Sequence, residues 1–103
     1  MGFVETDSRT LNITIIAHGD LEISNVVLST TGYINEDVQL TYDVTNNGGT
    51  DACRGYVAED GQTISTVWND SIDAGATESK SNILNFGTPG DKSIVLYVGY
   101  VTP

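Results

Sequence analysis

Residues 38–49 alternate apolar and polar side chains with unusual regularity, and this alternation limits the folds open to the chain. The apolar positions are mostly β-branched or aromatic and fall on one side: Val38, Leu40, Tyr42 and Val44. A period of two is typical of a strand buried on one face. Two Asn and two Gly at positions 46–49 tolerate positive φ and predict where the strand ends. The apolar face needs a second layer. Because no window of the sequence shows a helical period, that layer must be another sheet.

Other short segments, separated by Gly, Asn, Asp and Pro, predict further strands. We expect them over residues 10–17, 21–29, 51–59, 62–68, 76–86 and 92–101. Asp60-Gly61 predicts a two-residue hairpin, residues 69–75 are predicted as a loop, and a change of parity at Ser24-Asn25 predicts a bulge or a change of sheet. Strands spaced about 8–12 residues apart are typical of an immunoglobulin-type sandwich. The predicted fold is all-β: an immunoglobulin-like antiparallel β-sandwich of about seven or eight strands.

The length of 103 residues fits one domain. We expect a polar N-terminal arm over residues 1–9 and a single sandwich domain over residues 10–103. Residues 1–7 lack the basic start and apolar core of a signal peptide. The chain is then either a domain of a longer secreted protein or a complete small protein that assembles without export, and the Met at position 1 leans toward the second.

The charge balance excludes several classes of partner. Fourteen acidic residues face four basic ones, giving a formal charge of -10. This disfavours nucleic acid, whose phosphates need a basic patch, and anionic lipid surfaces. No apolar run approaches the ~18 residues of a membrane-spanning helix, so membrane insertion is not expected. The single cysteine, Cys53, rules out an intrachain disulfide and is expected to be a small buried apolar residue.

Several segments resemble one known family. Residues 20–28 are similar to the opening strand of CARDB modules, the cell-adhesion-related domains of bacterial and archaeal surface proteins. The Val-x-Asn-x-Gly pattern at Val44, Asn46 and Gly48 resembles their second strand and turn, and residues 71–75 and 89–98 resemble later segments. The resemblance covers about residues 20–100. It implies an immunoglobulin-like sandwich with no catalytic residues. Tyr100 stands where family members often have an acid, and residues 1–19 lie outside the resemblance.

Catalytic and metal-binding motifs are weak or missing in the sequence. His18 is the single histidine and is expected to lie in an exposed turn with Gly19 and Asp20. No nucleophile elbow, zinc, phosphate-loop or dinucleotide pattern occurs, so we expect no enzyme activity and no cofactor. Asn69, Asp70 and Asp73 are weak candidates for calcium ligands. They do not follow the EF-hand spacing, and a solvated acidic loop is the favoured interpretation.

Aromatic residues leave a carbohydrate-binding function open. Trp68 is the single tryptophan and could stack on a sugar ring. The favoured interpretation is a core ring between the two sheets, because a large aromatic side chain at a strand end usually packs inward. The five tyrosines are scattered over many elements and define no linear platform.

Two segments are candidates for protein contact. Residues 92–101 are apolar on both parities, so that Val95, Tyr97 and Val101 form a second face. We expect this face to be covered by the arm or a loop of the same chain, or by a partner. Residues 10–17 carry apolar side chains outside the family resemblance: Leu11, Ile13, Ile15 and Ile16. This predicted strand pairs either within its own sandwich or, with the arm before it, at a sheet edge of a neighbouring subunit.

The expected function is therefore that of a non-catalytic structural or interaction module in an external surface assembly. Cell-surface adhesion and virion decoration both fit, and the expected partners are protein subunits, copies of the same chain among them. The alternative is a carbohydrate-binding module, with or without calcium. A small hydrolase is a third and weaker hypothesis, because no site for it is present in the sequence.

Overall fold

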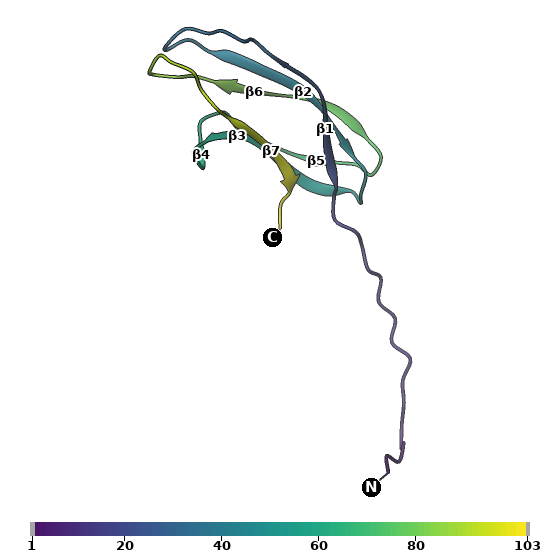
Figure 1. The fold of residues 1–103 in the computed structure, drawn as a ribbon. Helices are drawn as coiled ribbons and strands as arrows, with labels where there is room; N and C mark the ends of the chain where they lie inside the picture. Colours follow the sequence, from purple (N-terminus) through teal and green to yellow (C-terminus); the bar gives the residue numbers. More distant parts are fainter. Residues whose placement is uncertain (1, 103) are drawn as a thin grey trace.

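The computed structural model describes residues 2–102 and confirms an all-β sandwich (Figure 1). Seven strands form two antiparallel sheets, and the described residues contain no helix. The β2 sheet has β2 at its centre and contains β1 (Leu21–Leu28), β2 (Val38–Asn46) and β6 (Thr77–Leu84). The β3 sheet has β3 at its centre and contains β3 (Asp51–Glu59), β4 (Gln62–Thr63), β5 (Trp68–Ile72) and β7 (Val95–Tyr100). Among residues 2–102 there is accordingly no helix long and apolar enough to cross a membrane.

The core lies between β2 and β3, as the alternation of residues 38–44 predicts. Leu40, Tyr42 and Val44 are all at most 3% exposed, and Val38 packs against them. Strand β3 contributes Cys53 and Val57, which are also fully buried, so the prediction of an inward-facing, apolar Cys53 is confirmed. A one-residue slip of β2 would turn this whole set to solvent, which is why the register is firmly specified.

Two local predictions are confirmed by backbone geometry. Asp60 and Gly61 have φ values of 50° and 79° and join β3 to β4 through the pair Glu59↔Gln62. Positive φ at both positions is what a two-residue type I′ hairpin requires. In β1 the register with β2 shifts between Ser24 and Val27, with Asn25 at a φ of 52°, so the predicted bulge is present.

The region after the hairpin differs from the prediction. The strand expected over residues 62–68 is limited to β4, and the loop expected over residues 69–75 is wrong, because β5 occupies most of it. Ile64 and Ser65 still hydrogen-bond to Val57 of β3, but Ser65 also forms a bridge to Leu84 of the other sheet, so the ladder with β3 is interrupted between β4 and β5. β5 is an edge strand, and edge strands tolerate polar residues such as Asn69-Asp70-Ser71 because one side and one face contact water.

The strand predicted over residues 10–17 does not form within this chain. Residues 2–17 are exposed and run away from the sandwich as an extended arm, so that the molecule measures 75 × 31 × 17 Å (Figure 1). Period-two alternation favours an extended backbone, but a strand exists only when its N–H and C=O groups pair with a neighbour. Within the described chain, no sheet edge supplies that neighbour.

Candidate functional site

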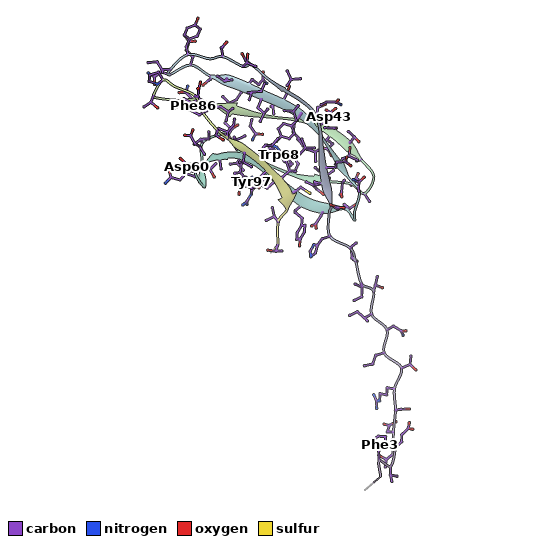
Figure 2. All side chains as sticks on the ribbon, viewed as in Figure 1. Phe3, Asp43, Asp60, Trp68, Phe86 and Tyr97 are labelled. Carbon is purple, nitrogen blue, oxygen red and sulfur yellow. The ribbon has the colours of Figure 1, made fainter. Side chains whose placement is uncertain are left out.

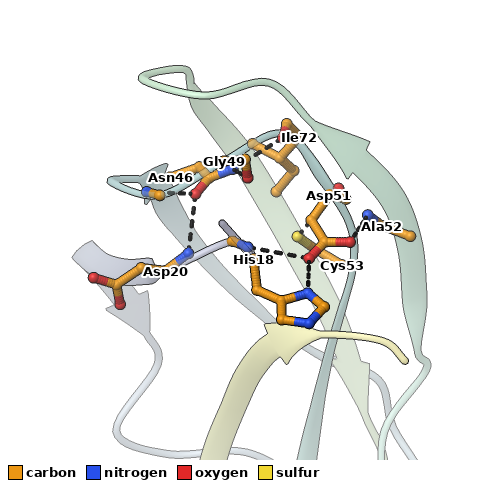
Figure 3. A network of polar contacts seen from close by, with 10 residues as sticks. His18, Asp20, Asn46, Gly49, Asp51, Ala52, Cys53 and Ile72 are labelled. Carbon is orange, nitrogen blue, oxygen red and sulfur yellow. Dashed lines mark hydrogen bonds and ion pairs between the residues drawn. The ribbon is translucent and has the colours of Figure 1, made fainter. Parts of the chain in front are cut away.

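The arm joins the sandwich at residues 17–20, which lie against the turn that follows β2 (Figure 3). The carbonyl of His18 accepts the N–H of Gly49 at 3.0 Å, and the carbonyl of Asp20 accepts the N–H of Asn47 at 2.8 Å. A side chain at Gly48 or Gly49 would collide with the backbone of residues 17–20. Two glycines are therefore needed here because one stretch of backbone packs directly on another.

Asn46 holds this junction together from inside the core. Its side chain is fully buried, and its Oδ1 accepts the N–H groups of Asp20 at 3.1 Å and Gly48 at 3.0 Å. Its Nδ2 donates to the carbonyls of Gly49 at 2.9 Å and Ile72 at 3.0 Å. One amide thus links the start of β1, the turn after β2 and the end of β5, and all its hydrogen-bonding groups are used.

Asp51 and Tyr100 fix the direction in which the arm leaves. One carboxylate oxygen of Asp51 accepts the N–H of Gly19 at 3.1 Å and lies 2.9 Å from Nδ1 of His18. The hydrogen bond with His18, followed by that from Gly19, lowers the pKa of Asp51. The His18 ring stacks on Tyr100 with centroids 4.1 Å apart. His18 is exposed, as predicted, but it also acts as an anchor that places the arm beside the C-terminal end of β7.

The two long sides of the sandwich differ in how well they cover the core. On the β5–β6 side, Ile72 and Leu84 are at most 1% exposed, and the Lys80 ammonium reaches across from β6 to Asp70 of β5 at 2.5 Å. On the β1–β7 side, the two strands lie next to each other (Figure 1), but their core-facing apolar residues stay partly exposed: Leu21, Ile23, Leu96 and Val98. The core is thus better covered along β5–β6, although Trp68 is partly exposed there, than along β1–β7. We call these the closed side and the open side.

The open side also has free backbone groups. Within residues 2–102, β7 pairs with β3 and with no other strand. The N–H of Val101 donates to the carbonyl of Ala52, and hydrogen-bonded pairs alternate along an antiparallel ladder. Residues 95, 97 and 99 therefore bond to β3. The N–H and C=O groups of Leu96, Val98 and Tyr100 point the other way, to the free edge of β7.

The outer face of β7 is uncovered as well. Val95 and Tyr97 are 50% and 47% exposed, and Tyr97 stacks on Tyr56 with centroids 5.5 Å apart. Val101 is half-buried. Figure 2 shows that the arm, with Phe3 near its start, extends far from Tyr97. The chain's own arm, one of the alternatives for covering this face, therefore does not cover it.

Trp68, the candidate sugar-stacking residue, is engaged inside the sandwich. Its Nε1–H donates to the hydroxyl of Tyr42 at 2.6 Å, and that hydroxyl donates to Oδ1 of the buried Asn82, also at 2.6 Å. The Lys80 ammonium lies 4.8 Å from the centre of the indole ring. Trp68 is partly buried and packs against the core, so its ring connects the β3 sheet to the β2 sheet.

The three candidate calcium ligands do not converge. Asn69 and Asp70 are consecutive residues of β5, so their side chains point to opposite faces. Asn69 accepts a hydrogen bond from Nε of Arg54 at 2.9 Å, and Asp70 pairs with Lys80. Asp73 lies after the end of β5. Residues 2–102 contain no cluster of three or more His, Cys, Asp or Glu side chains that could hold a metal ion.

The comparison with protein families identifies the sandwich. A family model described as CARDB matches residues 18–100. The chain belongs to the CARDB family. CARDB domains are β-sandwich modules of immunoglobulin-like fold and are generally non-catalytic. Comparisons with curated proteins and with solved structures gave no match.

The CARDB match does not include the arm. Its first residue is His18, which anchors the arm, and residues 1–17 lie outside it. The family likeness therefore accounts for the sandwich, including Asn46 and the glycines of its turn. It does not account for the apolar side chains of the arm, which need an explanation specific to this chain.

Sequence reasoning missed the buried polar residues of this CARDB domain. The sequence predicts a turn at Asn46, within a Val-x-Asn-x-Gly family pattern, and gives Asn82 no role, yet both side chains are 0% exposed. A signal was present in each case. Asn46 follows Leu40, Tyr42 and Val44 on the same parity, and Asn82 shares its parity with Leu84. A polar residue on an apolar parity indicates a buried hydrogen-bond hub.

Proposed function

We propose that this chain is a non-catalytic structural module that joins protein subunits in an assembly at an external surface, either a cell envelope or a virus particle. The arm is the observation that carries the proposal. Leu11, Ile13, Ile15 and Ile16 are 77–87% exposed on a segment that reaches away from the sandwich. A contiguous exposed apolar segment on a soluble domain usually marks a contact site.

The composition of the arm supports a protein partner. Residues 10–17 contain no charged side chain, although the whole chain has a formal charge of -10. This stretch can thus be buried without removing a charge from water, which would be costly. Its alternating pattern suits strand addition, in which main-chain bonds give affinity and alternate side chains give register. The acidic remainder keeps such a chain soluble until it assembles.

Sedimentation velocity on the full chain tests this function. We expect assembly that grows with protein concentration and with salt, because salt screens the repulsion between acidic copies. An Ile13→Ser/Ile15→Ser variant should lose assembly, while Asn12→Ser/Thr14→Ser, which changes the polar positions of the same segment, should keep it. Since all four residues are exposed, circular dichroism should show an unchanged sandwich in both. A full chain that stays monomeric at every concentration and salt would refute the proposal.

A carbohydrate-binding module is the second candidate, and Tyr97 is the observation that favours it. Trp68 is occupied by Tyr42 and Lys80, whereas Tyr97, stacked on Tyr56, presents a half-exposed aromatic ring. Aromatic rings of this kind can stack on sugars. A glycan array probed with the full chain separates the two functions. Tight binding that is lost in Tyr97→Ala and kept in the Ile13→Ser/Ile15→Ser variant would favour the carbohydrate module.

A further inference from the structure

We propose that residues 10–17 of one copy add as an antiparallel strand to the free edge of β7 in a second copy. This inference rests on the proposed function and specifies its contact surface and partner. The donor segment is extended and unpaired, and the acceptor edge is unpaired along the whole strand. Each therefore supplies the backbone partners that the other lacks.

The backbone of β7 selects the pairing. Leu96, Val98 and Tyr100 direct their N–H and C=O groups to the free edge. In an antiparallel ladder, residues directly opposite each other place their side chains on the same face. Because Leu96 and Val98 face the core, the donor residues opposite them must also face it. The donor must therefore present apolar side chains at alternate positions.

The arm has this pattern. Within residues 10–17, the odd positions are Leu11, Ile13, Ile15 and the smaller Ala17. Placed along β7, the side chains of Leu11, Ile13 and Ile15 lie on its core-facing side, next to the partly exposed core residues of β7 and β1. They would cover the apolar residues that the single chain leaves partly exposed: Leu21, Ile23, Leu96 and Val98. The β1–β7 side would then be closed, as the β5–β6 side already is.

One register places apolar donor side chains opposite apolar side chains of β7 on both faces of the sheet. With Ile13 opposite Val98, Leu11 lies opposite Tyr100 and Ile15 opposite Leu96, so each of these three residues lies opposite a residue of β7.

On the outer face, the same register sets Thr14 beside Tyr97 and Ile16 beside Val95. Ile16 is the one apolar residue at an even position of the segment, and Val95 is 50% exposed. A shift of two residues moves Ile16 off Val95 and leaves either Leu11 or Ile15 opposite a position outside β7. Cross-strand apolar pairs of this kind stabilise a sheet.

The anchor directs the arm to a second copy rather than to its own β7. His18 stacks on Tyr100, so the arm starts at the C-terminal end of its own β7. If the arm folded back along that strand, residues 10–17 would run parallel to it. The chain would also have to reverse at residues 17–19, which are held against Gly49 and Asp51. The antiparallel arrangement is open only to the arm of another molecule.

The donor and acceptor surfaces differ, so the contact is heterologous. Each copy donates its arm and offers its own β7, and repetition of this contact gives a head-to-tail row unless it closes on itself. The donor's sandwich would lie beyond the N-terminal end of the acceptor's β7, because Ile16 sits beside Val95. The arm therefore sets the spacing between copies.

A disulfide test reads the register directly. In the predicted pairing, positions 14 and 97 form a non-hydrogen-bonded pair on the outer face, close enough for a disulfide. We expect the Thr14→Cys/Tyr97→Cys chain to form reducible dimers or a ladder of multimers, with a 14–97 cross-link by mass spectrometry. The control Ile13→Cys/Tyr97→Cys places one thiol on the opposite face and should cross-link at least ~10-fold less. Cys53 is 1% exposed and stays in both chains.

A charge test complements it in the full chain. Ile13→Asp would bury a carboxylate in the core of the acceptor and should weaken assembly by roughly 100-fold or more. Asn12→Asp adds the same charge one residue away, on the outer face, and should change assembly by less than about three-fold. Both residues are exposed in the single chain, so neither change should affect its fold.

The outcomes separate this inference from the proposed function. Ile13-dependent assembly without a 14–97 disulfide overturns only the β7 pairing. A disulfide formed within one chain shows that the arm covers its own strand and also overturns it. A full chain that never assembles overturns both proposals.

Discussion

The two long sides of the sandwich are both built from antiparallel strands, yet one covers the core better than the other. Along β5–β6, Ile72, Leu84 and the Lys80–Asp70 ion pair seal the core. Along β1–β7, Leu96 and Val98 face the core and remain partly exposed. The same chain carries an apolar segment, residues 10–17, that its own sandwich does not use. This difference is the observation behind our proposal that the open side is a contact surface.

A matched pair of leucines gives the largest expected contrast between the sides. Leu84→Ala removes a side chain that is 1% exposed and should lower the free energy of unfolding by about 2–5 kcal/mol. Leu96→Ala removes a partly exposed side chain and should lower it by only roughly 1 kcal/mol in the monomer. Urea denaturation at low protein concentration measures both. Equal losses would show that the β1–β7 side is already closed.

Asn46→Ala tests the junction between the open side and the arm. The change leaves the buried carbonyl of Ile72 and part-buried backbone groups of Asp20, Gly48 and Gly49 without their partner, so we expect a loss of roughly 2–3 kcal/mol. Asn47→Ala is the control. Its exposed amide bonds only to Glu22, and its removal should cost less than about 0.5 kcal/mol. Similar urea midpoints for the two variants would contradict the role given to Asn46.

Lys80→Met probes the closed side with a smaller effect. Burial lowers the pKa of Lys80, but hydrogen bonds to Asp70 and Glu78 outweigh it, so the pKa is raised above 10.5. The stabilisation by these contacts is thus fully present below the ordinary pKa and is lost as pH rises through the folded one. We expect Lys80→Met to lose about 1 kcal/mol at pH 7, since Asp70 is half-exposed. The difference from the wild type should shrink at strongly alkaline pH, and a constant difference would contradict this.

The smallest effect is expected at Asp51, on the arm anchor. Its pKa is lowered, chiefly by the hydrogen bond with His18, so its stabilisation is present above the ordinary value of 3.8 and is lost as pH falls through the folded one. In Asp51→Asn, the melting temperature should therefore fall less steeply between pH 5 and pH 2 than in the wild type. Thermal unfolding between pH 5 and pH 2 measures it, and identical slopes would show that the anchor contributes nothing.

The sequence predicts the centre of this fold better than its margins. Leu40, Tyr42 and Val44 alternate because β2 is covered on one face only, so parity alone locates the strand. β5 is not predicted, because the polar run Asn69-Asp70-Ser71 is typical of a loop, whereas an edge strand also tolerates polar residues. For residues 10–17 the alternation predicts a strand, and the segment is extended but unpaired. The alternation of side chains carries no information on which sheet edge, or which molecule, supplies the pairing strand.

The candidate site could be predicted only in part for the same reason. Leu11, Ile13, Ile15 and Ile16 are visible as unexplained apolar residues in the sequence. The free groups of Leu96, Val98 and Tyr100 are not, because they depend on the register between β7 and β3. Asn46 and His18 form the anchor through contacts with residues far away in the chain, and only the folded structure brings these together.

Amide hydrogen exchange, resolved residue by residue, tests the central claim most directly. In the monomer, the amides of Val95, Tyr97 and Gly99 should be protected by β3, while those of Leu96, Val98 and Tyr100 exchange freely. In the assembled protein, we predict that these three become protected together with the amides of Leu11, Ile13 and Ile15. If assembly leaves the amides of Leu96, Val98 and Tyr100 as fast as in the monomer, the arm does not pair with β7 and the account is wrong.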